Sequence, residues 1–530
     1  MKCIPLLAAA ILAHAAPSSA GEPSGSRPIP PAYGPHTGLA EKDFAGAVSF
    51  KSTDRIVGTH YFYWYDSVTG AHIRDGDGSD ALTTHPPSLE DISFRSTAWH
   101  RRQLEDMSAA GIDFLLAVFW GAPSEQPQAA GLHWSYAGLP PLVAAREELL
   151  REGKSPPRIG LFYDTSTLQH NAWNYHADLT TDYGRRWFYA TVRDFFSLIP
   201  PRHWAMVDNR PIVLLYSAAF ALRHDQSVID FTKQAFPADF GGRVPWIGRD
   251  VSWQVRTDGT VAWGGALGLR TPGIASLGPG YDHSAVPGRT PLIVDRRGGA
   301  FYEENWMKLL RRPANMVMLE TWNEFHEGTD IAESREYGRH YIELTKKYAD
   351  WFRKGYVPPR EKGRYSGSAS VSFLAGARHP EQGLRLIANP DGMVAVEPCG
   401  DRMTLAIRPA AGQGAYIYFG VDDSFKPDAA GSFALEVDYF DAAAGRLDVD
   451  FDGSNAEAPF SGAYSPSGDT VDLTGSKTWR TARFRLDGAR FNAGQNSGAD
   501  FRLVIAGAPQ FAIGTVTLRR DANHPKNSAQ

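Results

Sequence analysis

The sequence predicts an α/β chain with two folded domains: a (β/α)8 TIM-like barrel over residues 46–353, followed by a C-terminal all-β sandwich (jelly roll) over residues 369–520. Three observations support this architecture. The chain has 530 residues, more than one hydrophobic core normally serves. Apolar strand-like runs alternate with helical patterns in the first region. In the second region, apolar and polar residues alternate with the period of a β-strand.

Eight short apolar runs predict the strands of the barrel: Ile56–Tyr63, Ile112–Trp120, Arg158–Tyr163, Pro211–Tyr216, Val244–Gly248, Val261–Gly264, Ile274–Gly278 and Asn315–Thr321. Helical patterns are expected at Ser96–Ala110, Pro140–Glu152, Tyr183–Ile199, Gln226–Phe236, Phe301–Arg311 and Ser334–Arg353. Eight strands alternating with helices in about 300 residues suit a closed parallel barrel. A doubly wound open sheet is the alternative, but no G-x-G-x-x-G loop joins a strand to a helix.

The N-terminus has the pattern of a secretory signal peptide. Met1-Lys2 precedes an apolar run from Ile4 to Ala16, and small residues lead to an expected cleavage after Ala20. The alternative is a membrane anchor, but the run is shorter than the roughly 20 residues that span a bilayer. We therefore expect a secreted or periplasmic protein that is not inserted in the membrane after cleavage.

Three further segments separate or end the domains. Residues 21–45 are rich in Pro, Gly and Ser and predict an extended linker. Residues 354–368 form a polar joint between the domains, and residues 521–530 a loose tail. Cys3 leaves with the leader, so Cys399 is the single cysteine of the mature chain and no internal disulfide is expected.

Charge and composition limit the classes of partner. The formal net charge is −5, without the basic surplus that phosphate contacts require, so no nucleic-acid partner is expected. The chain contains 14 Trp and 21 Tyr, whose rings stack on sugars but also fill cores, so composition alone does not choose between these uses. The oligomeric state stays open.

The most informative segment runs from Met316 to Asp330, where an apolar strand passes directly into polar and aromatic residues. The carboxyl ends of barrel strands carry the active site. Glu324 and Glu327 lie three residues apart at this position. Hydrolysis of a glycosidic bond needs one group to protonate the leaving oxygen and a second to support the anomeric centre, and two nearby carboxylates can divide this work.

The Glu pair also has two simpler interpretations. One is an ordinary polar loop with two solvated acids, but Trp322, Asn323 and His326 beside the pair favour a binding site. The other is a metal site, but the position four residues after His326 is Asp330, so there is no H-E-x-x-H motif. We therefore expect no metal and no cofactor.

The segment Thr321-Trp-Asn-Glu-Phe-His-Glu-Gly-Thr-Asp-Ile331 resembles the Asn-Glu-Trp-His-Glu-Gly-Thr-x-Ile segment of the endo-α-mannosidase family, glycoside hydrolase family 99, and its uncharacterised relatives. The similarity extends to His60–Tyr65 on the first strand. It also includes Asp106–Asp113, which leads to Phe119-Trp-Gly121. Together it covers most of residues 55–352.

The resemblance implies roles for five residues. Glu327 would be the general acid/base. Glu324 would assist the sugar 2-hydroxyl in attacking the anomeric carbon, which gives an anhydro-sugar intermediate and net retention. Trp120, Tyr63 and Tyr65 would line the sugar subsites. The implied activity is a retaining, endo-acting hydrolase of α-linked, mannoside-like or other, oligosaccharides or polysaccharides.

The sequence departs from the family pattern at the pocket. Phe119 and Phe325 stand where the family has Trp, and Trp64 follows Tyr63 where the family has Pro. The loop Asp66–Ser88 also differs. The reaction type therefore carries over better than the sugar, and a hydrolase of a different linkage is one alternative. A non-catalytic glycan-binding barrel and a metal-dependent hydrolase are others.

Other polar residues follow predicted strands and should face the same rim: Tyr163, Asp164, Tyr281 and Asp282. Each could contact sugar or hold a loop. Asp75–Asp80 resembles a calcium loop but has no Glu at loop position twelve, so a Gly/Asp turn is expected. In the sandwich, Trp479 and Asn496–Arg502 are typical of modules appended to carbohydrate-active enzymes, for which sugar binding and a purely structural role fit equally.

Overall fold

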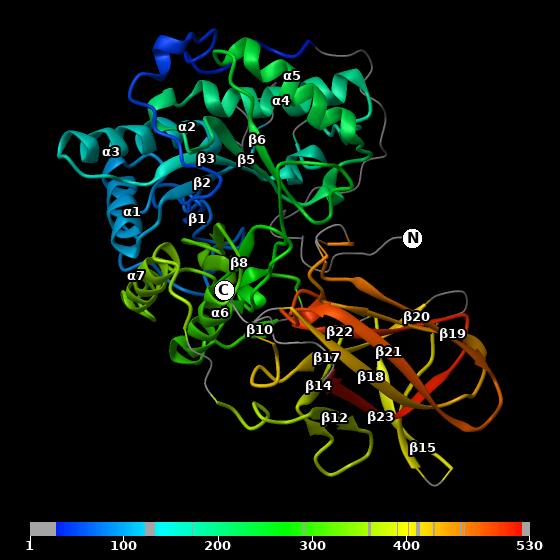
Figure 1. The fold of residues 1–530 in the computed structure, drawn as a ribbon. Helices are drawn as coiled ribbons and strands as arrows, with labels where there is room; N and C mark the ends of the chain where they lie inside the picture. The colour runs from blue at the N-terminus through cyan, green and yellow to red at the C-terminus, as the bar shows by residue number, and fades with distance from the viewer. Residues whose placement is uncertain are drawn as a thin grey trace, which may run out of the picture. The chain divides into compact units, whose positions relative to one another are not determined.

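A computed structural model describes residues 28–521, except for 122–132, 172, 290–291, 359–361, 390, 401, 410–413, 428–429, 456–457 and 461. The signal peptide, the first part of the linker and most of the tail therefore lie outside the described residues. The chain divides into two compact units. One contains the chain up to Leu269 and Gly273–Val357, and the other contains Arg270–Pro272 and the chain from Pro358 onward. Figure 1 shows both units.

The first unit contains the predicted barrel. Its eight parallel strands are β1 (Ile56–Tyr61), β2 (Phe114–Phe119), β3 (Arg158–Tyr163), β5 (Arg210–Leu215), β6 (Trp246–Asp250), β7 (Gly259–Val261), β8 (Ala275–Leu277) and β11 (Met316–Leu319). Each predicted strand overlaps one of them. β1 pairs with β2 on one side and with β11 on the other, so the ends of the strand series meet. The (β/α)8 prediction is confirmed.

The ring of strands is nearly closed, and its last junction lies between β7 and β8. There the Ile274 amide donates to the Thr260 carbonyl at 2.8 Å. The Ser276 hydroxyl donates to the Ala262 carbonyl, also at 2.8 Å. Each of these two strands is only three residues long, and β7 begins with Gly259, which supplies no side chain to pack. A single backbone bond and a side-chain bond replace a full ladder here.

Strand register decides which side chains enter the barrel. His60, Phe162 and Trp263 meet inside it, with ring centroids 4.5–5.4 Å apart. Burial lowers the pKa of His60 to about 3, so this imidazole is neutral. Below it, a side chain at Gly58 would lie 2.3 Å from the Phe114 ring, and only glycine leaves room for that ring. The barrel interior is therefore a packed core and not a pore.

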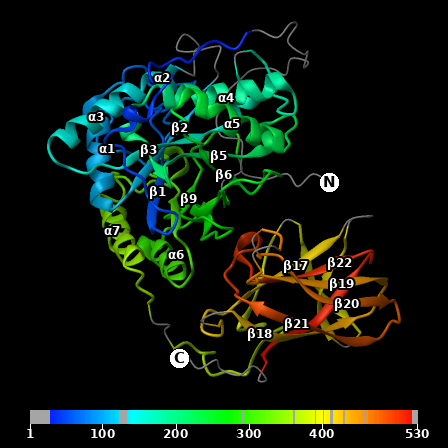
Figure 2. The ribbon, with the colours of Figure 1, turned by 45° about the horizontal axis from the view of Figure 1, so that its top comes forward.

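Helices cover the outside of the barrel (Figure 2). They are α1 (Thr97–Ala110), α2 (His133–Ala137), α3 (Leu139–Arg151), α4 (Asp182–Ser197), α5 (Gln226–Asp239), α6 (Ala300–Leu310) and α7 (His340–Arg353). The last helix begins at His340 and not at Ser334, because the Gly338 amide bonds the Ser334 carbonyl in a turn. Residues 251–274 are all described and form the 3-10 turn Gly265–Leu267 but no α-helix. No helix in the described ranges has the length and apolar character needed to cross a membrane.

The described part of the predicted linker is packed against the barrel. The Gly34 amide donates to the Ser197 hydroxyl at 2.8 Å, and the Tyr33 amide to the Asp194 carboxylate at 3.3 Å, both on α4. A side chain at Gly34 would overlap the Ser197 carbonyl, so glycine permits this close approach. Residues 28–50 thus run along the barrel, which differs from an extended linker.

The second unit is an antiparallel β-sandwich, as predicted. One sheet contains β12 (Ser370–Leu374), β13 (Glu381–Gln382), β15 (Val394–Cys399), β16 (Arg402–Ile407), β18 (Gly431–Phe440), β21 (Trp479–Ala489) and β23 (Phe511–Arg520). The other contains β14 (Leu384–Ile387), β17 (Ala415–Val421), β19 (Ala444–Phe451), β20 (Ser465–Thr474) and β22 (Phe501–Ala506). Alternate residues such as Leu435 and Val437 are buried between the sheets.

Candidate active site

The candidate site lies in the segment that follows β11, here called the acidic loop (Glu320–Asp330). The Thr321 amide bonds the Thr329 carbonyl at 3.0 Å, and the two Thr hydroxyls lie 2.9 Å apart. The loop therefore folds back on itself. A 3-10 turn, Phe325–Glu327, lies between its arms and ends at Gly328, whose φ of 52° favours glycine. Glu324 precedes this turn and Glu327 is its last residue, so both lie at the carboxyl end of the barrel, where catalytic groups belong.

Glu324 lies in a buried environment. Its side chain is 5% exposed, and one carboxylate oxygen lies 3.1 Å from His326 Nδ1. Burial, and next the charge of Glu327, raise the pKa of Glu324 well above its usual range. Burial, and next the charge of His72, lower the pKa of His326 to about 3, so its partner is a neutral imidazole.

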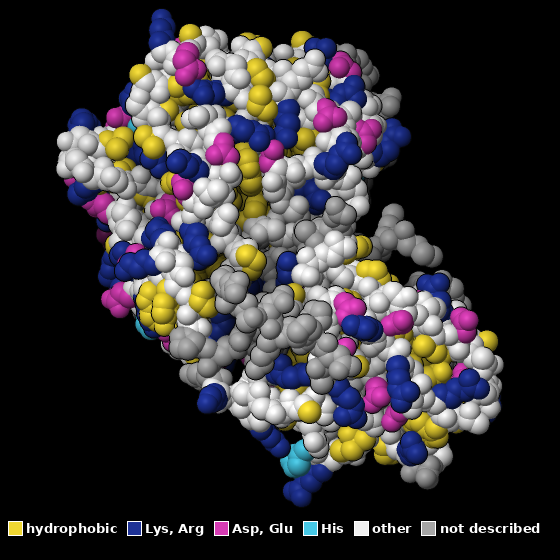
Figure 3. Space-filling model, in the orientation of Figure 1, with side chains coloured by type: hydrophobic (Ala, Val, Ile, Leu, Met, Phe, Trp, Pro, Cys, Tyr) yellow, Lys and Arg dark blue, Asp and Glu magenta, His cyan; other side chains and the backbone are white. Residues whose placement is uncertain are grey.

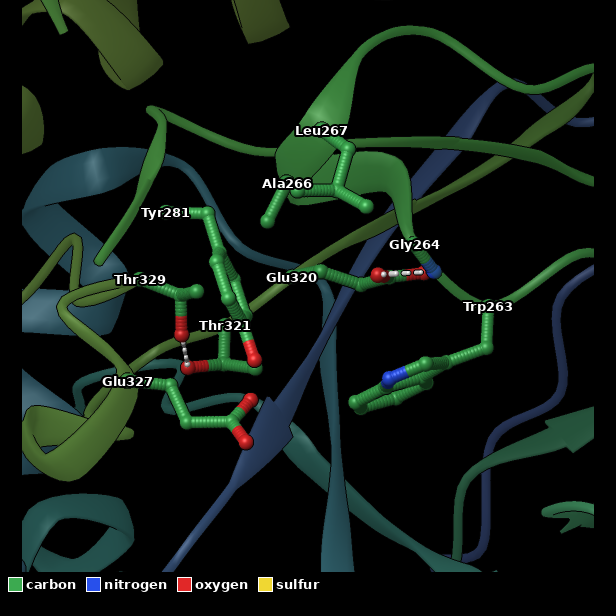
Figure 4. A pocket seen from close by; sticks show the side chains of 9 residues that line it. All are labelled: Trp263, Gly264, Ala266, Leu267, Tyr281, Glu320, Thr321, Glu327 and Thr329. Atoms are coloured by element: carbon green, nitrogen blue, oxygen red, sulfur yellow. Dashed lines mark hydrogen bonds between the residues drawn. The ribbon is translucent and has the colours of Figure 1, made fainter. Parts of the chain in front are cut away.

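Glu327 has a different environment. Its side chain is 14% exposed, and its carboxylate accepts a hydrogen bond of 2.7 Å from the Arg289 guanidinium. Tyr281 also bonds Glu327, and burial and the charge of Glu327 raise the pKa of this phenol. In Figure 4 the Tyr281 hydroxyl and the Glu327 carboxylate point toward each other. The two acids of the pair therefore have different partners: Glu324 lies beside a neutral imidazole, and Glu327 is paired with a guanidinium.

A small pocket adjoins Glu327 (Figure 4). It is lined by Trp263, Gly264, Ala266, Leu267, Tyr281, Glu320, Thr321, Glu327 and Thr329. Rings, hydroxyls and carboxylates, the groups that bind sugars, therefore converge on one small hollow beside Glu327.

Glu320 is a third acid of the pocket, and sequence reasoning missed it. Its carboxylate accepts a bond of 2.8 Å from the Gly264 amide. It was hidden inside the predicted strand Asn315–Thr321. Met318 pairs with Gly58, which faces the barrel interior, so Glu320, two residues on, faces inward as well. The alternation of inward and outward side chains along this strand was therefore the sequence signal that could have identified Glu320.

Tyr216, at the end of β5, is a second residue that was missed. Burial, and then the charges of Asp164, Glu327, Asp250 and Glu320, raise the pKa of its phenol well above the usual range. Four carboxylates from three parts of the barrel rim therefore act on this phenol: Asp164 after β3, Asp250 on β6, and Glu320 and Glu327 of the acidic loop. Such a neutral donor can orient carboxylates without adding charge.

The structure brings Trp120 and Asp164 together. Sequence analysis had predicted Trp120 for a sugar subsite and Asp164 for the same rim of the barrel. The Trp120 indole donates to the Asp164 carboxylate at 2.5 Å, and the Ser166 amide donates to its other oxygen at 3.1 Å. Burial raises the pKa of Asp164. The Trp120 ring also packs edge-on against Trp64 and Trp134, with centroids 5.5 Å and 5.4 Å away. An aromatic cluster therefore adjoins the side of the site where Glu324 lies.

Two predicted tyrosines of the first-strand motif hold backbone atoms. The Tyr65 hydroxyl donates to the Asn323 carbonyl at 2.9 Å and accepts from the Phe325 amide at 3.0 Å. Its ring lies parallel to His326 at 5.7 Å. The Tyr63 hydroxyl donates to the Ser135 carbonyl at 2.8 Å. Both residues are buried and support the site from behind.

Four other predicted site residues also support the structure. Tyr163 points outward and packs on Phe188 of α4, with centroids 5.0 Å apart. The Trp322 indole donates to Gln103 on α1 at 2.7 Å. The Asn323 amide forms two bonds, of 2.8 Å and 2.7 Å, with the backbone of Phe62. Asp282 accepts from the Ser284 amide at 2.9 Å.

The acidic loop is held from two sides. Thr83 and Thr84 donate their amides to the Phe325 carbonyl, and the Thr84 hydroxyl bonds Asp330 at 2.5 Å. The buried Arg296 guanidinium donates to the Gly328 carbonyl, the Asp330 carbonyl and the Asp330 carboxylate at 2.8–2.9 Å. These bonds fix the turn that carries Glu327.

The other polar clusters singled out by sequence have structural contacts. Asp77 accepts from the Ser79 amide at 2.9 Å, which forms the expected Gly/Asp turn. The Arg502 guanidinium lies 4.0 Å from the Tyr416 ring centre and 4.4 Å from that of Tyr464, and Arg402 lies 4.6 Å from that of Trp479. Within the described ranges, no group of three or more His, Cys, Asp or Glu side chains is arranged to hold a metal ion.

Comparison with known proteins supplies one family and several relatives. A family model described as "Domain of unknown function (DUF5010)" matches residues 43–357. Glycoprotein endo-alpha-1,2-mannosidase of Mus musculus is 32% identical over 96 residues, which is 15% of this chain and 21% of the mouse protein. The endo-alpha-1,2-mannosidase-like protein of Danio rerio is 31% identical over 96 residues, 15% of this chain and 22% of the fish protein. These relatives confirm the predicted resemblance, but the chain spans about a fifth of their length.

Two solved structures are also similar. The GH99 endo-alpha-mannosidase of Bacteroides thetaiotaomicron is 15% identical, with a TM-score of 0.42, and the match covers 57% of this chain and 98% of that one. The C-terminal CBM6 of a laminarinase from Zobellia galactanivorans is 12% identical, with a TM-score of 0.19, over 28% of this chain and 99% of that one.

Proposed function

Because the chain belongs to the DUF5010 family, whose description assigns no function, we propose an activity from its own site: a secreted or periplasmic glycoside hydrolase that cleaves α-linked oligosaccharides or polysaccharides within the chain and retains the anomeric configuration. The observation that carries the proposal is the acidic loop. Two carboxylates leave one loop at the carboxyl end of a barrel. One is buried beside a neutral imidazole, and the other is paired with a guanidinium. Divergent surroundings of this kind let two acids take different roles.

The roles follow from these surroundings and from the family resemblance. Glu324 takes the proton of the sugar 2-hydroxyl while that oxygen attacks the anomeric carbon. Glu327 gives its proton to the leaving oxygen as the glycosidic bond breaks. Water then opens the anhydro sugar at the anomeric carbon: Glu327 takes a proton from the water, and Glu324 returns one to the 2-oxygen. Two displacements at one carbon give net retention.

The raised pKa of Glu324 supports its role as a base. A carboxylate whose proton is held more tightly accepts a hydroxyl proton more readily, and bases tuned toward the working pH are the most effective. The same shift has a cost, because Glu324 must lose its own proton before it can act. Activity is therefore expected to fall on the acid side, at a pH above the usual range of a glutamate.

The pocket supports a neutral sugar as the bound unit. Glu320 and Glu327 line it, and Tyr216 lies among Asp164, Asp250 and these two acids. Carboxylates at this density repel uronates and sulfated sugars. The mouse relative, glycoprotein endo-alpha-1,2-mannosidase, supports an α-mannoside-like substrate. Two carboxylates and water are sufficient for the reaction, so no cofactor is proposed. On the face seen in Figure 3, basic and acidic side chains are interspersed, which gives no support for a nucleic-acid partner.

The test is a panel of α- and β-linked glycans incubated with the purified protein, followed by product sizing and by NMR of the first anomer released. We expect internal cleavage of an α-linked glycan with retention. Inactivity of both Glu324→Gln and Glu327→Gln would exclude a contaminating enzyme. Binding without cleavage would favour the non-catalytic glycan-binding alternative. Cleavage of a β-linked glycan would favour a hydrolase of a different linkage, and loss of cleavage with a chelator would favour a metal-dependent hydrolase.

A further inference from the structure

A half-buried histidine, His72, reaches the site from the segment Asp66–Ser88, which differs from the family pattern. Its ring lies flat on the ring of Trp64, with centroids 4.5 Å apart and planes 3° apart. It meets the ring of Trp120 nearly at a right angle, with centroids 6.1 Å apart. The family resemblance assigns Trp120 to a sugar subsite, so His72 adds a second wall beside that subsite.

His72 is also connected to the Glu pair through His326. The two imidazole rings lie 6.0 Å apart, and the His326 ring hydrogen-bonds the backbone of His72. The Nδ1 atom of His326 lies 3.1 Å from the Glu324 carboxylate. His72 is therefore separated by one side chain from the carboxylate to which we assign the 2-hydroxyl of the reacting sugar.

The leaving-group side of the site is built by different elements. Glu327 accepts a hydrogen bond of 2.7 Å from Arg289. Arg289 belongs to the hairpin formed by β9 (Tyr281–Asp282) and β10 (Ile293–Val294). His72, in contrast, contacts aromatic rings from the segments that follow β1 and β2. The ring of His72 thus belongs to the side of the site that lies away from the leaving group.

The imidazole of His72 can bond a ligand. Burial lowers its pKa to about 4, so the ring is neutral and carries one N–H donor and one nitrogen acceptor. Among the described residues, its ring has aromatic neighbours but no hydrogen-bond partner. A sugar hydroxyl can therefore donate to this ring or accept from it without displacing a protein contact.

The backbone indicates that the side chain at this position has a use. The φ of His72 is 55°, in the left-handed region that favours glycine. The Asp66 amide donates to the Ala71 carbonyl at 3.1 Å, and the Ile73 amide to the Gly70 carbonyl at 3.0 Å, so the turn is fixed. Backbone strain of this kind clusters at ligand-binding positions. The imidazole, and not the backbone, explains a histidine here.

We propose that His72 is a specificity-determining residue whose imidazole hydrogen-bonds a second sugar unit, bound against Trp120 on the Glu324 side of the scissile bond. The inference rests on the proposed function, in which the reacting sugar presents its 2-hydroxyl to Glu324 and its leaving oxygen to Glu327. A unit beyond Glu324 is therefore attached to the reacting sugar and not to the leaving group. An aromatic face with a neutral hydrogen-bonding group beside it suits a sugar ring, which has an apolar face and hydroxyls around its edge.

The expected effect depends on the length of the substrate. His72→Phe keeps a ring on Trp64 but has no ring nitrogen. A hydrogen bond between neutral groups changes binding by about 2- to 12-fold. The value of kcat/KM should fall by that factor for a glycoside with two sugar units and stay unchanged for one with a single unit. A purely structural role would lower both values together.

The experiment uses two aryl α-glycosides of the sugar that the wild type releases from the glycan panel, one with a single unit and one with a second α-linked unit. The ratio of their kcat/KM values is compared for the wild type, His72→Phe and His72→Gly, since glycine adopts the positive φ readily. His340→Phe is the matched control, because His340 is exposed and packs on Tyr341 at 5.2 Å. We expect the ratio to fall in both His72 variants and to stay in place in the control.

A thermal melt checks the fold of each variant. If the single-unit glycoside is not cleaved measurably, calorimetric titration of both glycosides into Glu327→Gln, with and without His72→Phe, gives the same ratio from dissociation constants. An unchanged ratio in a folded His72→Phe, with Glu324→Gln and Glu327→Gln inactive, overturns the inference and leaves the proposed function intact. Loss of folding in both His72 variants makes His72 a structural residue and also overturns it. Activity that survives in Glu327→Gln overturns the proposed function, and the inference with it.

Discussion

The two sides of the acidic loop hold similar carboxylates by different means. On one side, Glu324 contacts His326, and the aromatic cluster of Trp64, Trp120 and Trp134 lies nearby. These neighbours are neutral, and burial raises the pKa of Glu324. On the other side, Glu327 is more exposed and contacts Arg289 and Tyr281. Three residues of separation are enough to place two identical side chains in distinct electrostatic settings.

The comparison teaches how a short loop can supply both an acid and a base. The turn Phe325–Glu327 directs the two carboxylates to opposite neighbours, and bonds from Thr83, Thr84 and Arg296 fix that turn. The neighbours come from different parts of the chain. The aromatic side is built by the segments after β1 and β2, whereas the charged side is built by the hairpin of β9 and β10. Each side can therefore be altered separately, which the following substitutions use.

The largest effect is expected on the aromatic side. Glu324→Gln removes the base that assists the attacking hydroxyl, and general base help is worth about 100- to 10,000-fold. Turnover should fall by about that factor for natural and activated substrates alike, because the leaving oxygen is not involved. Kinetics on both substrate types measure this. A variant that loses turnover only on the natural substrate would mean that Glu324 acts on the leaving group.

The next largest effect is expected for Arg296, whose bonds hold the turn that carries Glu327. Arg296→Met leaves the Asp330 carboxylate and two carbonyls of the turn without their buried cation. Removing one partner of a buried ion pair typically costs about 3–5 kcal/mol of unfolding free energy. Denaturant unfolding measures the loss, and Arg297→Met, at an exposed pair with Glu304, should cost less than about 1 kcal/mol. Equal losses in the two variants would show that Arg296 does not hold the turn.

A smaller effect is expected for Trp120. Trp120→Phe keeps a ring but removes the indole bond to Asp164. Hydrogen bonds to charged groups contribute about 1.5–3 kcal/mol, so kcat/KM should fall by about 10- to 150-fold. Trp351→Phe on α7 is the matched control and should leave kcat/KM unchanged. If the two variants behave alike, the aromatic cluster takes no part in substrate binding.

The smallest effect concerns His85, which lies beside the Thr83 and Thr84 contacts. Its ring lies 2.9 Å from Asp80 and 2.7 Å from Glu336. Burial opposes the charged form, but the bonds to Glu336 and Asp80 raise the pKa of His85. His85→Gln should therefore cost at most about 1 kcal/mol, below about pH 6.5. The difference from wild type should vanish as pH rises through the raised pKa. A difference that grows with pH would contradict the ion pairs.

Strand positions were predictable because apolar runs alternate with helical patterns, and each of the eight runs overlaps a barrel strand. The direction of individual side chains was harder to predict. Tyr163 ends a strand but points to α4, because Phe162 takes the inward position. Glu320 was concealed in a strand, although its parity with Met318 indicated the interior.

Long-range contacts could not be predicted from local patterns. Arg289 reaches Glu327 across 38 residues of sequence, through a hairpin that no periodicity indicates. The Asn323 amide is used entirely by the backbone of Phe62, although its place in the motif suggested a sugar contact. Motifs located the site, whereas tertiary packing decided which motif residues face it.

The central claim is that Glu327 supplies the proton for the leaving oxygen. The most direct measurement compares turnover of Glu327→Gln and wild type on two substrates with the same sugar, one with a natural sugar leaving group and one with an activated leaving group. A glutamine keeps the shape but carries no transferable proton, so turnover on the natural substrate should fall by about 100- to 10,000-fold. The activated substrate needs less protonation and should lose much less. Near-normal turnover of a folded Glu327→Gln on the natural substrate would contradict the account.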